Sequence, residues 1–506
     1  MTPLGIHGMA NILSTRPNTI SSSGRAMQNI FFDITRLAWH LRRSDTYSGI
    51  QRAAVMMIAE TVNRVGAEHV FLSLYDTRKL RYRAISMRSI ETETLIDARK
   101  FRSVLGMDVD EDAVFPPLRG YASNRKKYSF HLARFHLNAL LRNNTFFRQR
   151  NVTIADWKSY LRAKRQTGKA IAGTEFASLA SKGDHLILLD CSWALARSIP
   201  HFKKAHENGL SVHVMVYDLI PIVRPELVTE GASMQLYDWL LSSLDFTTGY
   251  LACSQATKTD LEAFQKAHNV SRPVSLIPLA QNMVTAAPVV QAKGPLAERV
   301  NAEAYPRVLE LVGVKDAIRS LLQMPYVLCV GTLETRKNNW RIALAWDLLR
   351  KTVPINQMPK LVFAGRSGWM NDDFNRLMVN TGQLDGFISL IEAPSDAELA
   401  LLYQNCSFTI LASHYEGWGL PVGESLSYGK TAVVSNNSSL PEVGGDLVRY
   451  CDPLSPQSIM QACHDLIVDP SQREALEACI RATRLRTWAD VADDMIKATV
   501  RDKAIL

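Results

Sequence analysis

Two glutamates separated by a glycine-containing stretch point more directly to chemistry than any other residues of this chain. They are Glu416 and Glu424, and Gly417 and Gly419 lie between them. Glycine lets the backbone approach a ligand closely and take positive φ angles. Amide groups at the start of a helix, with the helix dipole behind them, bind phosphate oxygens. The pattern therefore predicts a site for a phosphorylated ligand, in which a carboxylate binds a diol of that ligand.

The runs on either side of this stretch predict the elements that position it. Residues 408–412 are apolar and typical of a strand, whereas residues 425–428 are apolar or small and typical of a helix that Gly429 ends. We expect Glu424 in the first turn of that helix, where a carboxylate is favoured. We expect Glu416 on the loop at the C-terminal end of the strand, where open α/β sheets bind ligands. The alternative is an ordinary strand-to-helix turn whose glutamates cap amide groups and face water.

A pair of cations, Arg336 and Lys337, follows the predicted strand 326–330 and would share a rim with Glu416. Negative charge develops on a pyrophosphate as its bond to a sugar breaks, and an adjacent guanidinium and ammonium can stabilise that charge without a metal. The alternative is that Arg336 and Lys337 are loop side chains that face water and bind no ligand. The sequence contains neither G-x-x-x-x-G-K-[ST] nor G-x-G-x-x-G after a strand, which argues against a P-loop NTPase and a dinucleotide oxidoreductase.

Strand-like and helix-like segments alternate in two long stretches of the chain. This alternation predicts two doubly wound α/β domains, each with a parallel sheet that helices cover on both faces. The alternation weakens between Leu279 and Met324, where we place the domain boundary, and residues 76–118 receive no assignment. The expected parts are a flexible leader (1–28), an N-terminal domain (29–285), a linker (286–323), a C-terminal domain (324–484) and a C-terminal helix (485–506).

The composition of the 506 residues, with 47% hydrophobic and 21% charged residues, is that of a soluble globular protein with several domains. No apolar run reaches the roughly 18 residues of a membrane-spanning helix. The first 28 residues lack the apolar core of a secretory signal. Seven cysteines are scattered without a C-x-x-C pair, so we expect neither zinc nor a disulfide framework, and a reducing cytosol is the natural compartment.

Positive charge is concentrated in residues 119–170. This segment contains thirteen Lys and Arg residues against one acidic residue, Asp156, a net charge of +12, whereas the whole chain carries +9. Apolar residues recur in it at helical spacing beside the basic ones. A basic helical insertion of this kind favours an anionic membrane surface as partner. A solvated charged face is the alternative, and nucleic acid ranks last. The helical pattern consists of Phe130, Arg134, Leu137, Leu140 and Leu141.

The stretch from Glu416 to Glu424 resembles the E-x7-E motif of the retaining glycosyltransferases of family 4. Four further segments are similar to neighbouring family motifs in the same order, and the likeness extends over residues 326–453. These segments are 330–338, 412–416, 439–444 and 451–453. Three N-terminal segments resemble bacterial members that build surface polysaccharides: 32–36, 49–52 and 216–221.

This resemblance implies a GT-B fold, in which two Rossmann-like domains face a central cleft. The C-terminal domain would bind a nucleotide-sugar, the N-terminal domain would bind the acceptor, and the last helix, near Trp488, would cross back to the first domain. Glu416 would contact the reacting sugar, and Arg336 and Lys337 the diphosphate. Glu424 would bind the ribose diol. The implied donor-binding residues are Thr332, Gly417, Trp418, Gly419, Leu420 and Glu424, and the implied acceptor-binding residues are Gly49, Tyr217 and Asp218.

Two positions depart from the family pattern. Many members have Arg directly after the strand glycine, where this chain has Thr332, so more of the phosphate charge falls to Arg336 and Lys337. Many members also have His before the acceptor-side Asp, where this chain has Tyr217. A tyrosine does not titrate near neutral pH, so the polar role of that histidine in sugar binding does not carry over to Tyr217.

The resemblance implies a retaining, metal-independent hexosyltransferase that needs no cofactor. Its donor would be a nucleotide-sugar, with GDP-mannose favoured and UDP- or dTDP-sugars possible. Its acceptor would be a lipid-linked surface glycan, such as O-antigen, capsule or exopolysaccharide, at the inner face of the cytoplasmic membrane. Two alternatives stay open. One is a nucleotide-sugar epimerase of the same fold, and the other is an inactive GT-B scaffold that binds membrane or glycan.

Overall fold

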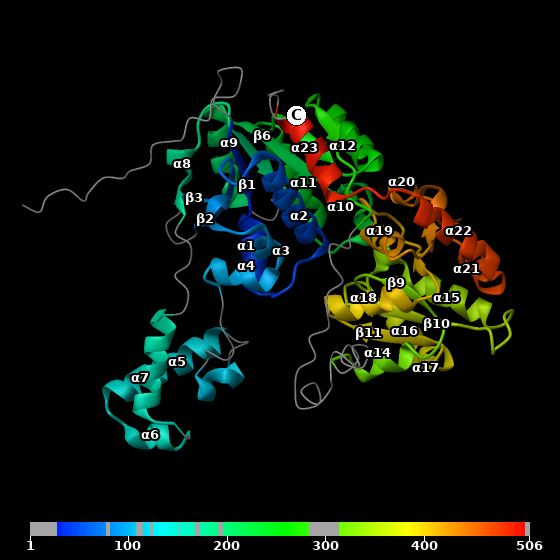
Figure 1. The fold of residues 1–506 in the computed structure, drawn as a ribbon, viewed down its shortest axis with the longest axis horizontal. Helices are drawn as coiled ribbons and strands as arrows, with labels where there is room; N and C mark the ends of the chain where they lie inside the picture. Colours follow the sequence, from blue (N-terminus) through cyan, green and yellow to red (C-terminus); the bar gives the residue numbers. More distant parts are fainter. Residues whose placement is uncertain are drawn as a thin grey trace, which may run out of the picture.

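The computed structural model describes residues 28–76, 81–107, 115–121, 125–150, 152–166, 173–190, 196–282 and 313–500. The expected leader therefore lies almost entirely outside the described residues. The described chain forms two α/β domains, each built on one sheet with helices packed against it (Figure 1). The predicted fold class is thus confirmed.

The N-terminal sheet has eight strands in the order β4-β3-β2-β1-β5-β6-β7-β8. Strand β1 pairs in parallel with both β2 and β5, so the strand order reverses there and creates a switch point. The central strands are short apolar runs that are buried throughout, as parallel strands covered on both faces must be. Their bounds are β1 (Ile30–Asp33), β2 (Val70–Asp76), β3 (Arg81–Ser86), β4 (Thr174–Glu175), β5 (His185–Leu188), β6 (Ser211–Val216), β7 (Gly249–Ala252) and β8 (Val274–Leu276).

One edge of this sheet corrects the expectation of purely parallel strands. Strand β3 pairs antiparallel with β2 and with β4. Only residues 77–80 separate β2 from β3, and a parallel return needs a crossover of about a dozen residues or more. This edge also accounts for part of the unassigned segment 76–118, the rest of which contains two short helices, α3 (Thr92–Ile96) and α4 (Ala98–Val104).

The remaining helices of the N-terminal domain connect its strands. Two of them begin with side-chain caps: Ser48 forms a capping box with Gln51, and Ser254 accepts a hydrogen bond from the Thr257 amide. Their bounds are α1 (Thr35–Leu41), α2 (Gly49–Val65), α8 (Phe176–Leu179), α9 (Ile199–Glu207), α10 (Ile220–Val223), α11 (Ala232–Ser243) and α12 (Gln255–Ala267).

The C-terminal sheet has six strands, all parallel, in the order β11-β10-β9-β12-β13-β14. Its switch point lies between β9 and β12. The strand bounds are β9 (Tyr326–Val330), β10 (Lys360–Gly365), β11 (Ile388–Glu392), β12 (Thr409–Leu411), β13 (Ala432–Ser435) and β14 (Arg449–Cys451). The helices are α14 (Asp316–Leu321), α15 (Asn339–Leu349), α16 (Asp372–Asn380), α17 (Gly382–Asp385), α18 (Asp396–Asn405), α19 (Leu420–Ser427), α20 (Leu440–Gly444), α21 (Pro456–Val468) and α22 (Pro470–Ala482).

The described end of the expected linker belongs to the C-terminal domain instead. Helix α14 buries Ile318 and Leu321 against Tyr326 and Leu328 of strand β9. Apolar side chains at helical spacing explain this packing, since they gain free energy only when they leave water. Residues 283–312, which include most of the expected linker, lie outside the described residues.

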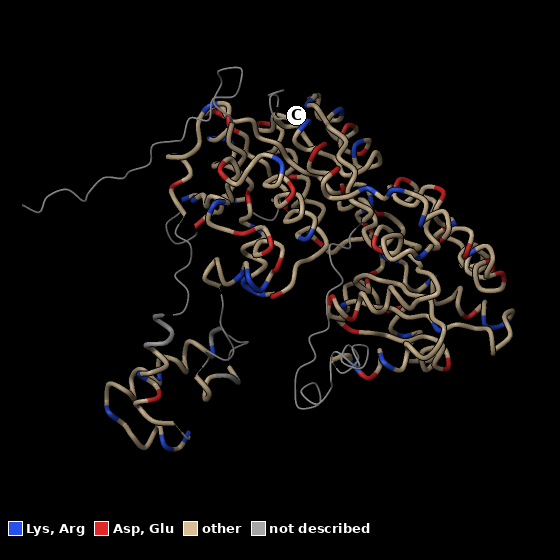
Figure 2. The backbone as a smooth tube through the Cα atoms, in the orientation of Figure 1, with Lys and Arg blue, Asp and Glu red and all other residues tan. Residues whose placement is uncertain are grey.

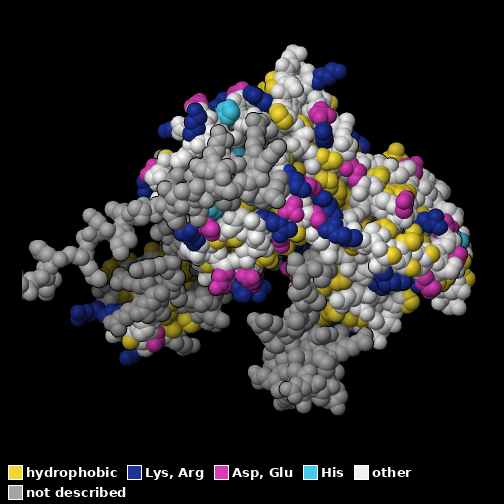
Figure 3. All heavy atoms as spheres, turned by 45° about the horizontal axis from the view of Figure 1, so that its top comes forward, with side chains coloured by type: hydrophobic (Ala, Val, Ile, Leu, Met, Phe, Trp, Pro, Cys, Tyr) yellow, Lys and Arg dark blue, Asp and Glu magenta, His cyan; other side chains and the backbone are white. Residues whose placement is uncertain are grey.

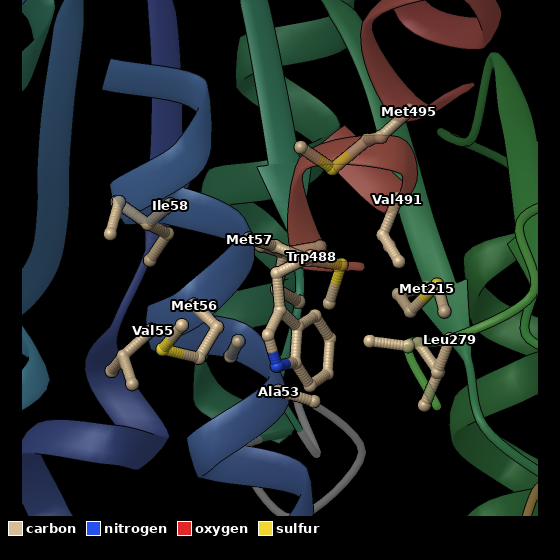
Figure 4. Packing of buried hydrophobic residues seen from close by; sticks show 14 of the residues in the cluster. Ala53, Val55, Met56, Met57, Ile58, Met215, Leu279, Trp488, Val491 and Met495 are labelled. Atoms are coloured by element: carbon tan, nitrogen blue, oxygen red, sulfur yellow. The ribbon is translucent and has the colours of Figure 1, made fainter. Parts of the chain in front are cut away.

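The last helix, α23 (Trp488–Thr499), packs along α2 of the N-terminal domain (Figure 1). Figure 4 shows the Trp488 ring among side chains from α2, β6 and the segment after β8, including Met57, Met215 and Leu279. Trp488 is 4% exposed, and burial of an aromatic ring of this size is worth about 2 kcal/mol or more. The C-terminal helix is therefore part of the N-terminal core.

The basic segment forms a separate helical body with its own small core, at the lower left of Figures 1 and 2. Its helices are α5 (Arg125–Leu140), α6 (Asn144–Arg148) and α7 (Ile154–Gln166). The core is aromatic and includes Phe135, Phe147 and Trp157, whereas Phe130 and Leu137 on the same helix α5 are 62% and 56% exposed. Lys and Arg side chains lie beside hydrophobic ones on its surface (Figure 3). Among the described residues, no helix is long and apolar enough to cross a membrane.

Candidate active site

Two loops of the C-terminal domain leave the carboxyl ends of β9 and β12, on either side of the switch point. The backbone joins them directly, because the His414 amide donates to the Arg336 carbonyl at 2.9 Å. Asn338 also joins them, since its side-chain amide donates to the carbonyl oxygens of Ala412 (2.9 Å) and Pro453 (2.7 Å). These bonds fix the loop that carries Arg336 and Lys337 against the loop that carries Glu416.

A buried ion cluster forms where these loops meet. The two carboxylate oxygens of Glu416 accept from Lys337 Nζ and Arg336 Nη1, both at 2.6 Å. The other terminal nitrogen of Arg336, Nη2, donates to Glu334 Oε1 at 2.6 Å. Glu416, Lys337 and Glu334 are 6%, 8% and 2% exposed, so water screens these charges little. The structure thus brings together the three residues for which the sequence suggests a catalytic role.

The protonation states of the cluster follow from its geometry. Burial disfavours the Glu416 carboxylate, but Arg336 and Lys337 outweigh it and lower the pKa of Glu416 to about 2. Burial likewise disfavours the charged guanidinium of Arg336, but Glu416 and Glu334 raise its pKa above the ordinary value. Glu416 and Arg336 are therefore charged near neutral pH.

The turn after Glu416 corrects the expected start of the next helix. Helix α19 begins at Leu420, and Glu424 lies in its second turn, not its first. Pro421 explains the early start, because proline is favoured in the first turn of a helix, where its missing N–H is not needed. Gly419 precedes the helix with φ of 102°, a backbone conformation that glycine adopts without strain.

Glu424 nevertheless faces the N-terminal domain. Its Oε2 accepts from the Tyr403 hydroxyl at 2.7 Å, and its Oε1 accepts from Arg52 Nη1 of the N-terminal domain at 3.3 Å. Arg52 also contacts Asp396 at 3.2 Å. The carboxylate is thus held between the two domains by one hydroxyl and one guanidinium.

The expected acceptor-binding residues lie directly across from the loop that carries Glu416 and Gly417, which we call the donor loop. A Cβ atom added at Gly417 would overlap the Tyr217 carbonyl oxygen, so the loop needs glycine at this position. The Cys253 thiol donates both to this carbonyl and to that of Gly417, at 2.9 and 3.2 Å. Gly49 is the first residue of α2, and its added Cβ would lie 3.0 Å from Leu420 Cδ1.

Side chains on the acceptor side have defined partners. The Tyr217 hydroxyl donates to the Leu189 carbonyl at 2.7 Å, so it braces its own domain. Asp218 accepts from the Ile220 amide at 3.1 Å. Burial raises the pKa of Asp218, and the charge of Arg336 opposes that rise, which shows that this carboxyl group lies within electrostatic reach of the ion cluster.

Two of the donor-binding residues that the resemblance implies have side chains whose positions do not suggest contact with a ligand. The Trp418 indole is 6% exposed and belongs to the hydrophobic core. Thr332 is partly buried, and its Cγ2 lies against Gly368. The backbone of Trp418, and not its side chain, is therefore available for the donor-binding role that the resemblance implies.

Sequence reasoning missed Glu334 and Arg52. Both lie inside segments that resemble family motifs, and each is close in sequence to a chosen residue: Glu334 to Arg336, and Arg52 to Gly49. Their partners could not be deduced, because Arg52 and Glu424 are 372 positions apart. Within the described ranges, no group of three or more His, Cys, Asp or Glu residues is arranged to hold a metal ion.

Comparison with known proteins defines the class. Residues 315–486 match the family described as Glycosyl transferases group 1. The O-antigen chain mannosyltransferase B of Escherichia coli is 35% identical over 153 residues, which are 30% of this chain and 39% of that protein. The serotype-specific mannosyltransferase WbdA of Escherichia coli is 23% identical over 335 residues, 64% of this chain and 38% of that protein. The chain therefore spans less than two fifths of the length of these curated relatives.

Solved structures agree on the architecture. Anabaena HepE in complex with UDP and glucose superimposes with a TM-score of 0.53 at 11% identity, over 93% of this chain and 99% of that one. The structure described as trehalose-6-phosphate from Escherichia coli bound with UDP-2-fluoro glucose gives 0.52 at 11% identity, over 94% and 99%. This likeness concerns the fold alone. The chain has the GT-B fold, as the sequence predicts, and its residues 315–486 match the Glycosyl transferases group 1 family.

The depressed pKa of Glu416 predicts a pH-dependent contribution to stability. A carboxyl group whose pKa falls from about 4.5 unfolded to about 2 folded stabilises the protein fully above pH 4.5 and loses this effect as the pH falls toward 2. Glu416→Gln should therefore lower the free energy of unfolding by about 3 kcal/mol at pH 7. Urea unfolding should show that the difference from the unmodified chain shrinks between pH 4.5 and 3.

Glu207→Gln, at an exposed position on α9, is the matched control and should leave the urea midpoint unchanged. A deficit of Glu416→Gln that stays constant from pH 7 to pH 3 would contradict the charge balance described for the cluster.

Proposed function

We propose that the chain is a retaining, metal-independent glycosyltransferase that moves a hexose from a nucleotide-sugar to a hydroxyl of a growing, lipid-linked surface glycan. The observation that carries this proposal is the cluster of Arg336, Lys337 and Glu416 at the switch point of the C-terminal domain. It faces Tyr217 and Asp218 across the cleft, so a donor and an acceptor can meet there.

Mannose is the first candidate for the transferred sugar. The curated relatives named above are mannosyltransferases, and a third, the MMP α-(1→4)-mannosyltransferase of Mycolicibacterium hassiacum, is 30% identical over 116 residues, 22% of this chain and 28% of that protein. We therefore favour GDP-mannose as donor. The UDP ligands named for the structural neighbours do not favour UDP here, because an 11% identity carries the fold alone.

In the proposed reaction the bond between the sugar C1 and the diphosphate oxygen breaks, and a bond from C1 to the acceptor oxygen forms on the same face. The proton of the acceptor hydroxyl passes to the departing diphosphate oxygen, so no protein nucleophile is needed. Arg336 and Lys337 stabilise the charge that develops on the diphosphate. Glu416 holds both cations in place and borders the reacting sugar.

Both cations keep donor capacity for a ligand. An ammonium has three donors, and Lys337 Nζ uses one of them on Glu416. The guanidinium has five, and Arg336 uses its two terminal nitrogens on Glu416, Glu334 and the Tyr415 carbonyl. The remaining N–H groups can bind phosphate oxygens while the cluster stays intact. Such preorganisation lowers the cost of reordering during the reaction.

Nucleotide binding should depend on Glu424. We expect calorimetric titration with UDP, GDP, ADP and dTDP to show one preferred nucleotide, with GDP first. Glu424→Ala should weaken its binding at least about tenfold, because a carboxylate that accepts from two ribose hydroxyls is worth about 1.5 kcal/mol or more.

Glu262→Ala, at an exposed position on α12, serves as the control and should bind as the unmodified chain does. If none of the four nucleotides binds, the inactive scaffold becomes the better explanation. If Glu424→Ala binds normally, the ribose lies elsewhere.

Turnover should depend on Glu416. Sugar release from a panel of nucleotide-sugars should occur with one donor and rise with acceptor, and Glu416→Ala should lower kcat at least about 100-fold, the scale for one transition-state contact. EDTA should leave the rate unchanged. Release that ignores acceptor and yields an altered nucleotide-sugar would identify an epimerase, and a strict metal requirement would contradict the proposed role of Arg336 and Lys337.

We also propose that the basic insertion binds the anionic inner face of the cytoplasmic membrane. Helix α5 and the residue after it carry four exposed apolar side chains within a segment of net charge +12: Phe130 (62%), Leu137 (56%), Leu140 (81%) and Leu141 (68%). Changing these four to serine, or reversing Arg125, Lys126 and Lys127, should weaken sedimentation with phosphatidylglycerol vesicles at least about tenfold.

The control is the pair Ile355→Ser and Val379→Ser in the C-terminal domain, where the side chains are 80% and 79% exposed. If vesicle binding survives both sets of changes, the basic residues of the insertion form a solvated surface and do not bind the membrane.

A further inference from the structure

A cavity of about 90 Å³ opens beside the candidate active site, within the N-terminal domain. Its walls come from the start of α2, the end of β6, and helices α10 and α11, and they are mostly apolar. A cavity of this volume has space for several water-sized groups. It can therefore hold the hydroxyl and hydroxymethyl groups along one edge of a sugar ring.

Four side chains with polar groups line this cavity: Tyr217, whose hydroxyl donates to the Leu189 carbonyl, and three others. Asp190 and Asp218 follow the adjacent strands β5 and β6, and Trp239 lies on α11. The indole N–H of Trp239 has no hydrogen-bond partner among the described residues, although the side chain is only 5% exposed. A buried donor without a partner is unfavourable, so a ligand that accepts from it gains affinity. Asp190 is 6% exposed, so its carboxyl group also lies away from bulk water.

The cavity is rich in carboxyl groups, and the described residues that line it include no Lys or Arg. A third carboxyl group, that of Asp33 at the end of β1, lies near enough to Asp190 for the two to interact electrostatically. The ionised groups among them repel a phosphate, whereas burial raises the pKa of Asp33 to about 7 and the pKa of Asp218 above its usual value. Carboxylates accept hydrogen bonds from sugar hydroxyls, and the indole N–H donates to one. The chemistry of the cavity thus fits an uncharged polyol and not an anion.

The cavity also lies at the right place for an acceptor. Tyr217, which lines it, meets Gly417 of the donor loop through its carbonyl group, and Asp218 interacts electrostatically with Arg336 and Glu416. A sugar in the cavity would therefore lie next to the loop that carries Gly417, where the proposed donor binds.

We propose that this cavity binds the terminal, uncharged sugar of the acceptor, with Asp190 and Asp218 accepting from its hydroxyls and Trp239 donating to one. This inference rests on the proposed glycosyltransferase function and narrows the class of acceptor. The chain extends an existing saccharide and does not transfer a first sugar to a lipid phosphate.

The test uses the full chain with its preferred nucleotide-sugar and three kinds of acceptor. These are neutral triosides that end in mannose, glucose or galactose, the same triosides with a 6-phosphate on the terminal sugar, and a polyprenyl phosphate. We expect transfer to at least one neutral trioside, with kcat/KM at least about tenfold lower for its phosphorylated form, because the cavity repels anions. We expect no transfer to the polyprenyl phosphate.

Two conservative variants report on the cavity itself. Trp239→Phe keeps the aromatic wall and removes the N–H, and it should raise the acceptor KM about tenfold while the donor KM stays unchanged. Asp190→Asn keeps the shape and removes a charge, so the ratio of kcat/KM for neutral over phosphorylated trioside should fall several-fold. Trp340→Phe, at a 39% exposed position on α15, is the control and should change neither constant. Thermal melting verifies that all three variants fold.

Three results would overturn the assignment while leaving a working glycosyltransferase: preference for a phosphorylated acceptor or the polyprenyl phosphate, donor hydrolysis with no neutral trioside accepted, or an unchanged acceptor KM in Trp239→Phe. Absence of both nucleotide binding and donor turnover is a different outcome. It would reject the proposed function itself, and the cavity assignment with it.

Discussion

The ion pairs of Glu416 with Arg336 and Lys337 are the interaction on which the geometry of the donor side depends. Removing these three side chains from water costs several kcal/mol per charge, and the cost is offset only because both oxygens of the carboxylate meet a cation at 2.6 Å. Neither loop can move away without leaving a buried charge unpaired. The cluster therefore holds two loops, whose residues Arg336 and Glu416 are 80 positions apart, in one arrangement before any substrate binds.

The facing domain is bound to this arrangement at several points. Glu442, in the C-terminal domain, accepts from the Gln255 and Ala256 amides at 2.7 and 3.0 Å and thus caps helix α12 of the N-terminal domain. Arg52 reaches Glu424 from the first turn of α2, and the far part of α2 packs against α23. Helix α2 thus links the hydrophobic core, which includes Trp488, to the proposed nucleotide site. Movement of one domain against the other must change the Arg52 contact.

Local sequence signals predicted the elements well where the deciding forces are local. The apolar runs 326–330 and 408–412 predicted strands β9 and β12. Ser395 forms a capping box with Glu398 at the start of α18, another feature that local spacing decides. The antiparallel edge was missed because the length of a connection, and not the pattern of a strand, decides its direction. The roles of Glu334, Arg52, Asp190 and Trp239 could not be predicted, because each depends on a neighbour that only the folded chain supplies. A helix start moved by Pro421 likewise changed the expected place of Glu424.

The two switch points differ in their hydrogen-bonding groups. The rim of the C-terminal sheet holds the cations Arg336 and Lys337, paired with Glu416 and Glu334, whereas the ends of β1, β5 and β6 in the N-terminal sheet hold Asp33, Asp190 and Asp218. An anionic diphosphate can accept from the remaining N–H groups at the first rim, and a neutral polyol can hydrogen-bond to the carboxyl groups at the second. Two substrates of different charge would therefore enter opposite halves of the same cleft, with their reacting atoms brought together where Gly417 meets Tyr217. In this arrangement the distribution of hydrogen-bonding groups selects the orientation of the reactants, and the short contact at Gly417 sets how closely they approach.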